Sequence, residues 1–318
     1  MSAIQLPATG TASPPARTWA LAIAAYLLVY GALLAAVHIR EGFGLEEPLF
    51  VLGVYGGVLC LFAWLSTLRA VPRDMPVRDP ARETRLILAW YLFLVVFITF
   101  GFTAVRSLSS DPTVQHASII VTKLVVFVLA PFLAMRVLCG YRMRDFADLR
   151  RGLSGHWIAF VVMGAAIIAF QLVFGRAGRD LPALHAGPGE LVLGAVIAMA
   201  VATVEAGLVE EYFFRALLLD RLAARLRSPA PALVITSLLF GLAHAPGLYL
   251  RPEIMMESVT EPSVLLAVGY SVVILSVAGL VFGLLWLRTR NLLLVVLLHG
   301  LNDCIPAIAD TVQSLRGG

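Results

Sequence analysis

The chain has 318 residues, of which 60% are hydrophobic and 14% charged, and its mean hydropathy is +0.89. Soluble domains carry about 25% charged residues, so this composition excludes a chain that keeps a solvated surface on all sides. The formal net charge is +4, but the arginines cluster at the ends of apolar runs, where membrane topology explains them. We therefore expect a membrane protein with lipids as partners and no nucleic-acid partner.

Long apolar segments recur along the whole sequence. Crossing about 30 Å of hydrocarbon takes roughly 20 apolar residues, and every buried amide must be satisfied there, so such runs must be helices. We expect an all-α, polytopic transmembrane bundle of about 8–9 membrane helices with an internal polar cavity. The segments are Thr18–Val37, Leu49–Leu68, Leu86–Val105, Ser118–Leu138, Trp157–Phe174, Glu190–Tyr212, Ala232–Leu250, Val264–Leu287 and Leu292–Ala309.

The charges between these segments predict the topology. Arginines gather in alternate loops, which fall on one side if nine helices alternate, and the positive-inside rule places that side and the N-terminus in the cytoplasm. We divide the chain into a disordered cytoplasmic N-terminus (1–17), N-terminal membrane helices (18–156), a catalytic membrane domain (157–310) and a C-terminal tail (311–318). The arginines of these loops are Arg69, Arg73, Arg78, Arg82, Arg85, Arg142, Arg144, Arg150, Arg151, Arg215, Arg221, Arg225, Arg227, Arg288 and Arg290.

Glu210, Glu211 and Arg215 form a polar cluster at the end of the sixth segment. Glu211 and Arg215 are four residues apart, so on a helix they share a face and can form an ion pair. Glu210 is rotated by about 100° and stays outside that pair, which leaves one available carboxylate. The alternative is a helix end whose acids are both solvated at the headgroups, whereas a sixth helix extended through Leu219 would place Glu210 deeper.

A second polar residue, His244, follows Phe240 by four positions inside the seventh segment. A lone buried histidine is more often a packing residue than a catalyst, so His244 taken alone favours packing. Glu205 is a further acid within an apolar segment, and the sequence identifies no partner for it. Charged groups in the membrane cost about 2.5–3.5 kcal/mol each on insertion scales, and a chain that keeps them usually uses them.

The last segment carries a third cluster, His299, Asn302 and Asp303. These residues stand at i, i+3 and i+4, so their side chains project from one helical face. A polar contact between helices is the alternative explanation. Together with Glu210 and His244, the cluster could activate water, because a carboxylate accepts a proton from it while an imidazole polarises it, and His299 with Asn302 or Asp303 could stabilise an oxyanion.

These motifs, in this order, resemble the CPBP family, which includes CAAX prenyl proteases and the Abi-like bacteriocin-processing proteins. The matching residues are Glu210, Glu211 and Arg215, then Phe240 and His244, then His299 and Asp303, within about Glu190 to Ala309. The resemblance implies an intramembrane endopeptidase in which Glu210, assisted by His244, activates water. It further implies that His299 and Asp303 bind the oxyanion, with Glu211, Arg215 and Phe240 in support. Some members carry Asn at the position of Asp303, and Asn302 could supply that amide here.

The resemblance leaves the cofactor and the substrate open. Glu210, His244 and His299 could be three zinc ligands with an open position, although we favour a metal-independent reaction. We expect a peptide or protein substrate, a cavity that opens toward the cytoplasm, and residence in a bacterial inner membrane. The alternatives are a non-catalytic immunity or scaffold protein of the same fold, and a transporter whose acids and histidines relay protons.

Overall fold

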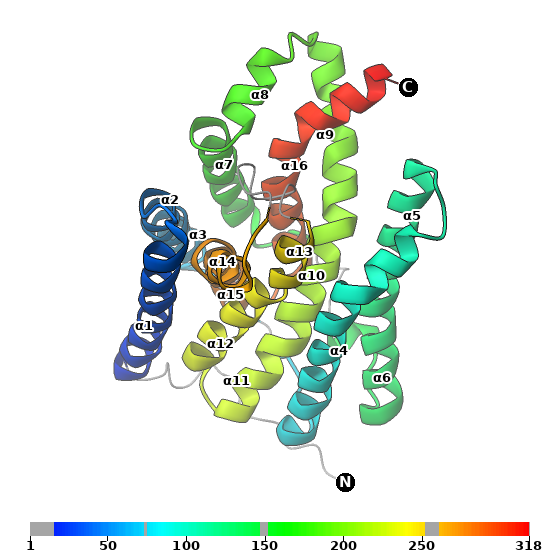
Figure 1. Ribbon diagram of the computed structural model, residues 1–318. Coiled ribbons are helices and arrows are strands. Elements are labelled where there is room, and N and C mark those ends of the chain that lie inside the picture. The colour runs from blue at the N-terminus through cyan, green and yellow to red at the C-terminus, as the bar shows by residue number, and fades with distance from the viewer. Residues whose placement is uncertain (1–15, 73–74, 147–151, 252–260, 318) are drawn as a thin grey trace.

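Every regular element in the described part of the chain is a helix, as expected for an all-α membrane bundle (Figure 1). The computed structural model describes residues 16–72, 75–146, 152–251 and 261–317. In these residues, 8 helices are long and apolar enough to cross a membrane, and a bent pair raises the number to 9. Most of the predicted disordered N-terminus lies outside the described residues, and Arg17 is already helical.

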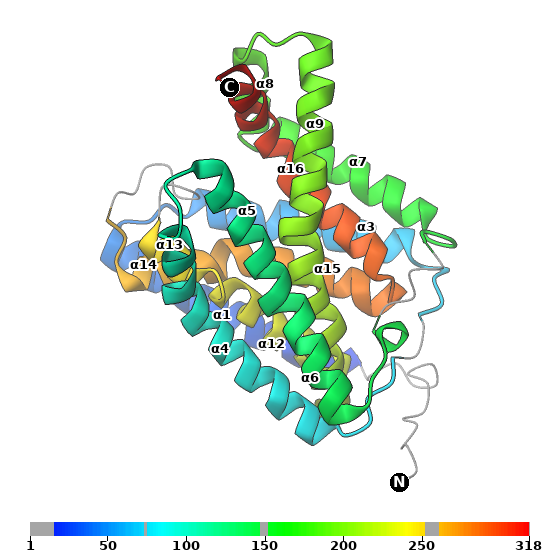
Figure 2. The same cartoon turned by 90° about the vertical axis from the view of Figure 1, so that its right-hand side faces the viewer.

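The first half of the chain contributes helices that cross the bundle in alternate directions (Figures 1 and 2). Some contain a π-helical stretch, labelled η, but continue as one rod. A short 3₁₀ turn, Met143–Asp145, follows them, and α8 is bent from α7 by 67°. In order, they are α1 (Ala16–Glu41), α2–η1–α3 (Glu46–Ser66), α4 (Pro80–Arg106), α5–η2–α6 (Pro112–Cys139), α7 (Trp157–Val173) and α8 (Ala177–Ala183).

The second half contains the longest rod, which runs from Pro188 to Leu226. It joins α9 (Pro188–Ala202), η5 (Thr203–Leu208), α10 (Val209–Glu211), η6 (Tyr212–Leu219) and α11 (Asp220–Leu226). The remaining elements are α12 (Pro229–Leu242), α13 (Ala245–Leu250), α14 (Val264–Tyr270), η8 (Ser271–Leu275), α15 (Ser276–Thr289) and α16 (Leu292–Gly317). The residues assigned to a C-terminal tail, 311–317, form the last turns of α16.

Proline and capping residues explain where several helices begin. Pro80 and Pro112 open α4 and α5, where a missing N–H costs nothing because the first turn leaves its amides unpaired. Asp79 and Asp111 precede them, and their carboxylates accept hydrogen bonds from first-turn amides. The turn after α6 contains Gly140 at φ 72°, a left-handed conformation that glycine adopts without strain.

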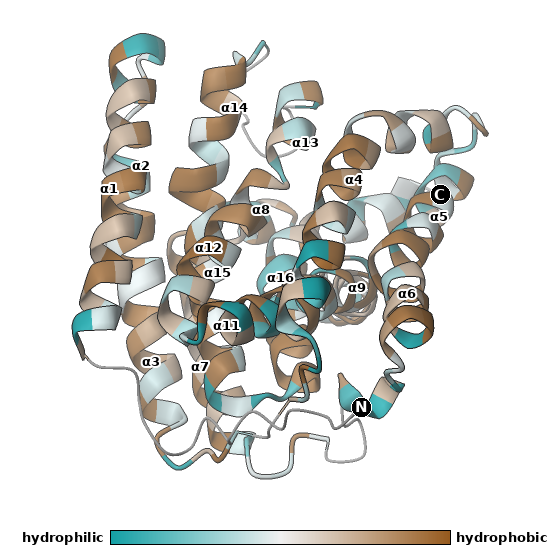
Figure 3. Ribbon diagram, turned by 90° about the horizontal axis from the view of Figure 1, so that it is seen from below, coloured by the Kyte–Doolittle hydropathy of each residue, from teal (hydrophilic) through white to brown (hydrophobic). Residues whose placement is uncertain are grey.

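The outer faces of the peripheral helices are apolar and exposed, as lipid contact requires (Figure 3). In α1, for example, Leu28 is 74% exposed, and in α4 Phe100 is 70% exposed. The inner core is formed mainly by η6, α12, α15 and α16, where Phe282, Trp286 and Leu298 are fully buried. Intramembrane polar groups in these elements are therefore shielded from lipid.

The arginine-bearing connections predicted to share one side do meet at one end of the bundle. Arg78 donates a hydrogen bond to the carbonyl oxygen of Cys139 (2.8 Å), and Arg288 donates to the Thr67 hydroxyl (2.6 Å). Asn291, between α15 and α16, donates to the carbonyl oxygen of Gly152 (2.9 Å). We call this the Arg-rich end, defined by the connections after α3, α6, α11 and α15. The opposite end holds the connections after α1, α4, α8 and α13.

Candidate active site

The long rod presents two adjacent carboxylates near its middle. Glu210 and Glu211 belong to the single α-helical turn α10, between the π-helical stretches η5 and η6. π-helical turns are rare and often occur at functional sites. Because the rod continues to Leu226, Glu210 lies well inside the bundle and not at a helix end, so the solvated-end alternative is wrong.

Two glycines bring the last helix against this rod. A Cβ added at Gly207 would lie 2.5 Å from the carbonyl oxygen of Val296, and one added at Gly300 would lie 2.9 Å from the Cα of Thr203. Small residues at such crossings let helix backbones approach closely. The crossing places His299 of α16 beside Glu210 and Glu211.

Glu210 lies between the two histidines that the sequence analysis selected. Its Oε1 is 3.8 Å from His244 Nε2, and its Oε2 is 3.9 Å from His299 Nε2. The separation from His244 suits one water molecule within hydrogen-bond distance of both groups, since a hydrogen bond spans about 2.7–3.0 Å. The Glu210 side chain is 17% exposed and that of His244 26%, so water can reach this pair.

His244 is held with one ring nitrogen toward Glu210. Its Nδ1 donates to the carbonyl oxygen of Phe240 (2.8 Å), one turn earlier in α12. This bond fixes the proton on Nδ1 and leaves Nε2 as the nitrogen that faces Glu210. The spacing of Phe240 and His244 therefore matters through the backbone of Phe240 as well as through its ring.

His299 is clamped between an aromatic ring and a carboxylate. Its ring stacks on Phe282, with centroids 4.9 Å apart and planes inclined by 8°, and its Nδ1 donates to Glu211 Oε1 (2.8 Å). Its Nε2 lies 3.4 Å from Asp303 Oδ2. Carboxylates thus face both nitrogens, an arrangement that a ring carrying N–H on both can satisfy.

Glu211 forms the expected ion pair with Arg215, 3.0 Å from Oε2 to Nε, and both side chains are fully buried. The Arg215 guanidinium lies 4.8 Å from the centre of the Phe240 ring, a cation–π contact. Phe240 in turn packs on His244 and His299, with ring centroids at 5.1 and 6.1 Å. The Glu211–Arg215 pair therefore contacts both histidines through Phe240, in addition to forming the ion pair that its i, i+4 spacing predicts.

Asn302 and Asp303 follow His299 by three and four residues on α16. The Asn302 amide donates to Asp303 Oδ1 (3.0 Å), so it is engaged with the carboxylate and not with Glu210. Asn302 Oδ1 accepts from the Tyr55 hydroxyl (3.2 Å) and from Gln171 Nε2 (3.1 Å). A chain of contacts therefore runs from η1 and α7 through Asn302 and Asp303 to His299.

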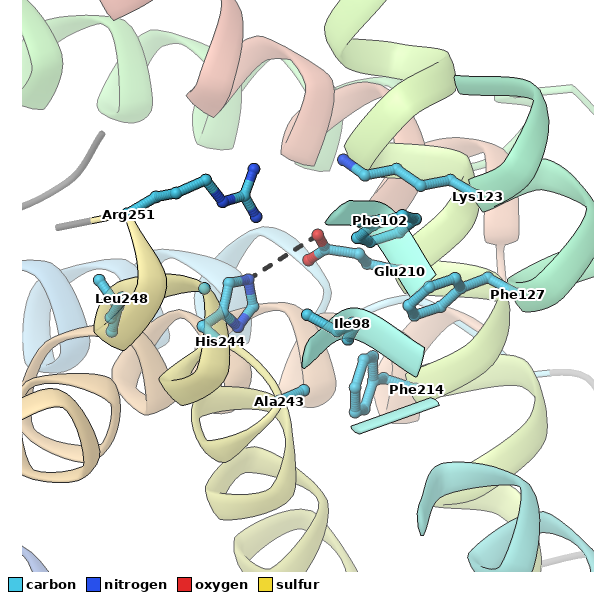
Figure 4. A pocket seen from close by; sticks show the side chains of 11 residues that line it. Ile98, Phe102, Lys123, Phe127, Glu210, Phe214, Ala243, His244, Leu248 and Arg251 are labelled. Carbon is cyan, nitrogen blue, oxygen red and sulfur yellow. Dashed lines mark ion pairs between the residues drawn. The ribbon is translucent and has the colours of Figure 1, made fainter. Parts of the chain in front are cut away.

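A cavity of about 160 Å³ lies in front of Glu210 and His244 (Figure 4). Its wall includes the aromatic rings of Phe102, Phe127 and Phe214, and among the described lining residues His299, Asn302 and Asp303 do not appear. Among the described residues, the wall consists of Ile98, Phe102, Lys123, Phe127, Glu210, Phe214, Ala243, His244, Gly247, Leu248 and Arg251.

Lys123 reaches this cavity from α5 and supplies the partner that the sequence did not identify for Glu205. Its Nζ lies 2.8 Å from Glu205 Oε1, and His116 Nε2 lies 3.5 Å from the other oxygen. A charge pair within two apolar rods is consistent with the rule that intramembrane ions pair with one another. Lys123 is the only lysine of the chain, and this isolation within an apolar segment was a signal in the sequence.

The candidate zinc ligands do not form a metal site in this arrangement. In the residues that the structure describes, no group of three His, Cys, Asp or Glu side chains is placed to hold an ion. Glu210 Oε1 and Oε2 diverge toward different histidines, and His299 Nε2 also faces Asp303. We therefore assign no step to a metal.

Comparison with known proteins bears directly on this geometry. Residues 192–305 match the family model described as type II CAAX prenyl endopeptidase Rce1-like, which covers about a third of the chain and includes all three polar clusters. The chain carries an Rce1-like domain. No curated protein and no solved structure matched the chain. The matched family is one of CAAX-type membrane endopeptidases, and the long apolar helices of the described residues indicate an integral membrane protein.

The Rce1-like domain does not build the site alone. Glu210, His244, His299 and Asp303 lie inside it, but Ile98, Phe102, Lys123 and Phe127 of the cavity wall come from helices before residue 192. Tyr55 and Gln171 also lie outside the matched residues. Sequence reasoning missed both. Gln171 stands out as a polar residue in the apolar α7, whereas Tyr55 carries no distinguishing signal.

The cavity lies mostly in the half of the bundle away from the Arg-rich end. The walls from α4 and α13 belong to the parts of those elements nearest the opposite end, since α4 begins at the Arg-rich end and Arg251 follows α13 (Figure 2). The predicted cytoplasmic Arg-rich end and the predicted opening of the cavity toward the cytoplasm are therefore in conflict, and both stay predictions.

Proposed function

We propose that the Rce1-like domain hydrolyses peptide bonds with a water held between Glu210 and His244. The observation that carries this proposal is the approach of Glu210 Oε1 to His244 Nε2 at 3.8 Å, at the wall of a cavity, with both groups water-accessible. Glu210 accepts a proton from the water as its oxygen attacks the peptide carbonyl carbon. His244, whose Nδ1 proton is held by Phe240, accepts a hydrogen bond from that water through Nε2 and aligns it.

The proposed second half of the reaction returns that proton. The C–N bond of the tetrahedral intermediate breaks as the protonated Glu210 donates to the departing amine, which leaves a free carboxylic acid and a free amine. We assign His299 Nε2, 3.9 Å from Glu210, to the developing oxyanion as a hydrogen-bond donor. Glu211 accepts from Nδ1 of His299 and so orients the ring. The one proton on Nε2 faces Asp303 at 3.4 Å before the reaction and turns to the oxyanion as that charge develops, because an ionised Asp303 cannot itself donate.

We place this activity in a bacterial inner membrane. Lys123 is the only lysine beside many arginines, a bias typical of GC-rich bacterial genomes. Prenylated CAAX substrates do not suit such a host, so we propose a peptide or protein substrate of the kind processed in peptide maturation or bacteriocin self-immunity.

The test is turnover by the full chain in liposomes, with a mixed-sequence library of fluorescence-quenched peptides as the probe. Glu210→Gln keeps the size of the side chain but removes the proton acceptor, and we expect turnover to fall by about 100-fold or more, the range for loss of a general base. Glu190→Gln is the matched control, because Glu190 lies exposed at the start of the same rod. Near-normal turnover by Glu210→Gln would exclude the proposed mechanism.

A further inference from the structure

The two ends of the bundle differ sharply in positive charge. Many described arginines lie at the Arg-rich end, namely Arg17, Arg69, Arg78, Arg82, Arg85, Arg136, Arg142, Arg144, Arg221, Arg225, Arg227, Arg288 and Arg290. At the opposite end the described arginines are Arg40, Arg106, Arg176, Arg179, Arg251 and Arg316. Connections rich in arginine stay in the cytoplasm, so this asymmetry orients the whole bundle.

The contacts between connections make this orientation a property of the folded protein and not of single loops. The hydrogen bonds from Arg78 to Cys139 and from Arg288 to Thr67 join three arginine-bearing connections into one surface. At the opposite end, Ser263 donates to Glu41 (2.7 Å) and Arg316 contacts Glu190 (2.8 Å). The connections at each end are bonded to one another, so all connections of one end should lie on the same side of the membrane.

The cavity belongs to the end that is poor in arginine. Phe102 lies one turn from the end of α4 at Arg106, and Gly247 and Arg251 belong to or follow α13. Figure 4 shows Arg251 and Lys123 on the same side of Glu210. In the same view the side chains of His244 and Glu210 point toward each other. Toward the Arg-rich end, Glu211, Arg215 and the rings of η6 fill the interior without exposure.

We propose that substrate enters this cavity from the extracytoplasmic face of the membrane. The substrate class is then a polypeptide segment that has been exported or is displayed on that face, not the tail of a cytoplasmic protein. This inference rests on the proposed function, because that function identifies the cavity as the substrate site. The side of the membrane from which water enters the cavity is a separate physical property. It can therefore be tested without any turnover.

The experiment uses cysteine labelling in intact bacterial cells that express the full chain. In a variant with Cys60, Cys139 and Cys304 replaced by Ala, we introduce Gly247→Cys in the cavity wall. A Cβ at Gly247 meets no atom closer than Arg251 Nη2 at 3.8 Å, so the position has room. Arg225→Cys is the matched control, because Arg225 is exposed on α11 at the Arg-rich end.

We expect a membrane-impermeant maleimide to label Gly247→Cys in intact cells and Arg225→Cys only after permeabilisation. The reverse pattern, labelling of both or neither in intact cells, or no labelling of Gly247→Cys after permeabilisation would each overturn the proposal. If the labelling is as expected but the full chain shows no peptidase activity in liposomes, the proposed function is contradicted. The proposed orientation of the cavity would still hold in that case.

Discussion

The last two spans of the Rce1-like domain are much more buried than the helices that precede the domain. Within the domain, the buried share of the most apolar window is 28% in the rod Pro188–Leu226, 44% in Pro229–Leu250 and 56% in both α14–α15 and α16, against 22% to 33% in the spans from α1 to α6. The domain forms the core and carries the reactive groups, while the earlier helices present large faces to lipid. Yet Tyr55, Lys123 and Gln171 of those helices bond to groups at or beside the site.

The matched domain therefore supplies the reactive groups of the site, but residues outside it complete the cavity wall and the contacts to Asn302. Two charge pairs, one fully buried and one partly exposed, attach the earlier helices to it. Arg221 Nε lies 3.3 Å from Glu83 Oε2 at the Arg-rich end, and Lys123 pairs with Glu205 beside the cavity. Neither pair could be kept by the domain alone, because an unpaired ion in the membrane is costly. Variants in each region should therefore fail in different ways.

The largest effect on stability is expected inside the domain, at Glu211. Glu211→Gln leaves the fully buried Arg215 without its counter-ion, and breaking a buried pair costs about 3–5 kcal/mol. Arg215→Gln should behave similarly. Thermal denaturation in detergent should show both variants strongly destabilised, in contrast to Glu210→Gln, which should melt near the parent temperature and be inactive.

Glu211 also holds Nδ1 of His299, so its loss should cost activity even in molecules that remain folded. The comparison is turnover per folded molecule. A fully stable and inactive Glu211→Gln beside an active Glu210→Gln would mean that the two carboxylates have exchanged roles.

Glycine packing offers a second and smaller contrast between the regions. Gly300→Ala adds a methyl group 2.9 Å from the Cα of Thr203, at the crossing that brings His299 to Glu211. Overpacking of this kind costs about 1–3 kcal/mol, and here it should also lower turnover. Gly31→Ala in α1 is the control, since a Cβ there meets nothing within 4 Å.

Equal melting temperatures and equal turnover for Gly300→Ala and Gly31→Ala would show that the α16 crossing tolerates more separation than the structure implies. A loss of turnover in Gly300→Ala without a change in melting temperature would still support a positioning role for the crossing.

Local spacing predicted the parts of the fold and site that depend on neighbours in sequence. Each predicted apolar segment falls on a single observed rod and extends past that rod by at most two residues. The Glu211–Arg215 pair forms as its i, i+4 spacing predicts. The approach of Glu210 to His244 and His299 was also expected, because each polar group was costly alone. The predicted sixth segment ends at Tyr212 because Arg215 lowers the hydropathy beyond it, even though Glu211 neutralises that charge. The observed rod continues to Leu226, which agrees with the alternative of a helix extended through Leu219.

Contacts between distant segments could not be read in this way. The bond from His299 to Glu211 depends on a crossing set by Gly207 and Gly300, and no local periodicity specifies which helices cross. The bend between α7 and α8 and the position of the cavity also depend on how whole rods pack. Tyr55 is one aromatic residue among many, and only its position opposite Asn302 distinguishes it.

The smallest effect is expected outside the domain, at the two donors to Asn302. Tyr55→Phe and Gln171→Met each remove one hydrogen bond, worth about 0.5–1.5 kcal/mol, and the other donor remains. If these residues position His299 through Asn302 and Asp303, each variant should lower kcat by up to about tenfold and leave KM unchanged. Tyr30→Phe is the control, because Tyr30 is another buried tyrosine of the early helices and bonds to the Pro48 carbonyl oxygen, away from the site.

A double-variant cycle distinguishes positioning from general weakening. Tyr55→Phe should add little to the loss caused by Asp303→Ala, because both act on the same chain of contacts to His299, and residues in one network are not additive. Additive losses, or a Tyr30→Phe variant that loses as much activity as Tyr55→Phe, would show that the early helices act only by holding the bundle together. Non-additive losses would instead place Tyr55 and Gln171 in the machinery that orients His299, although both lie outside the family match.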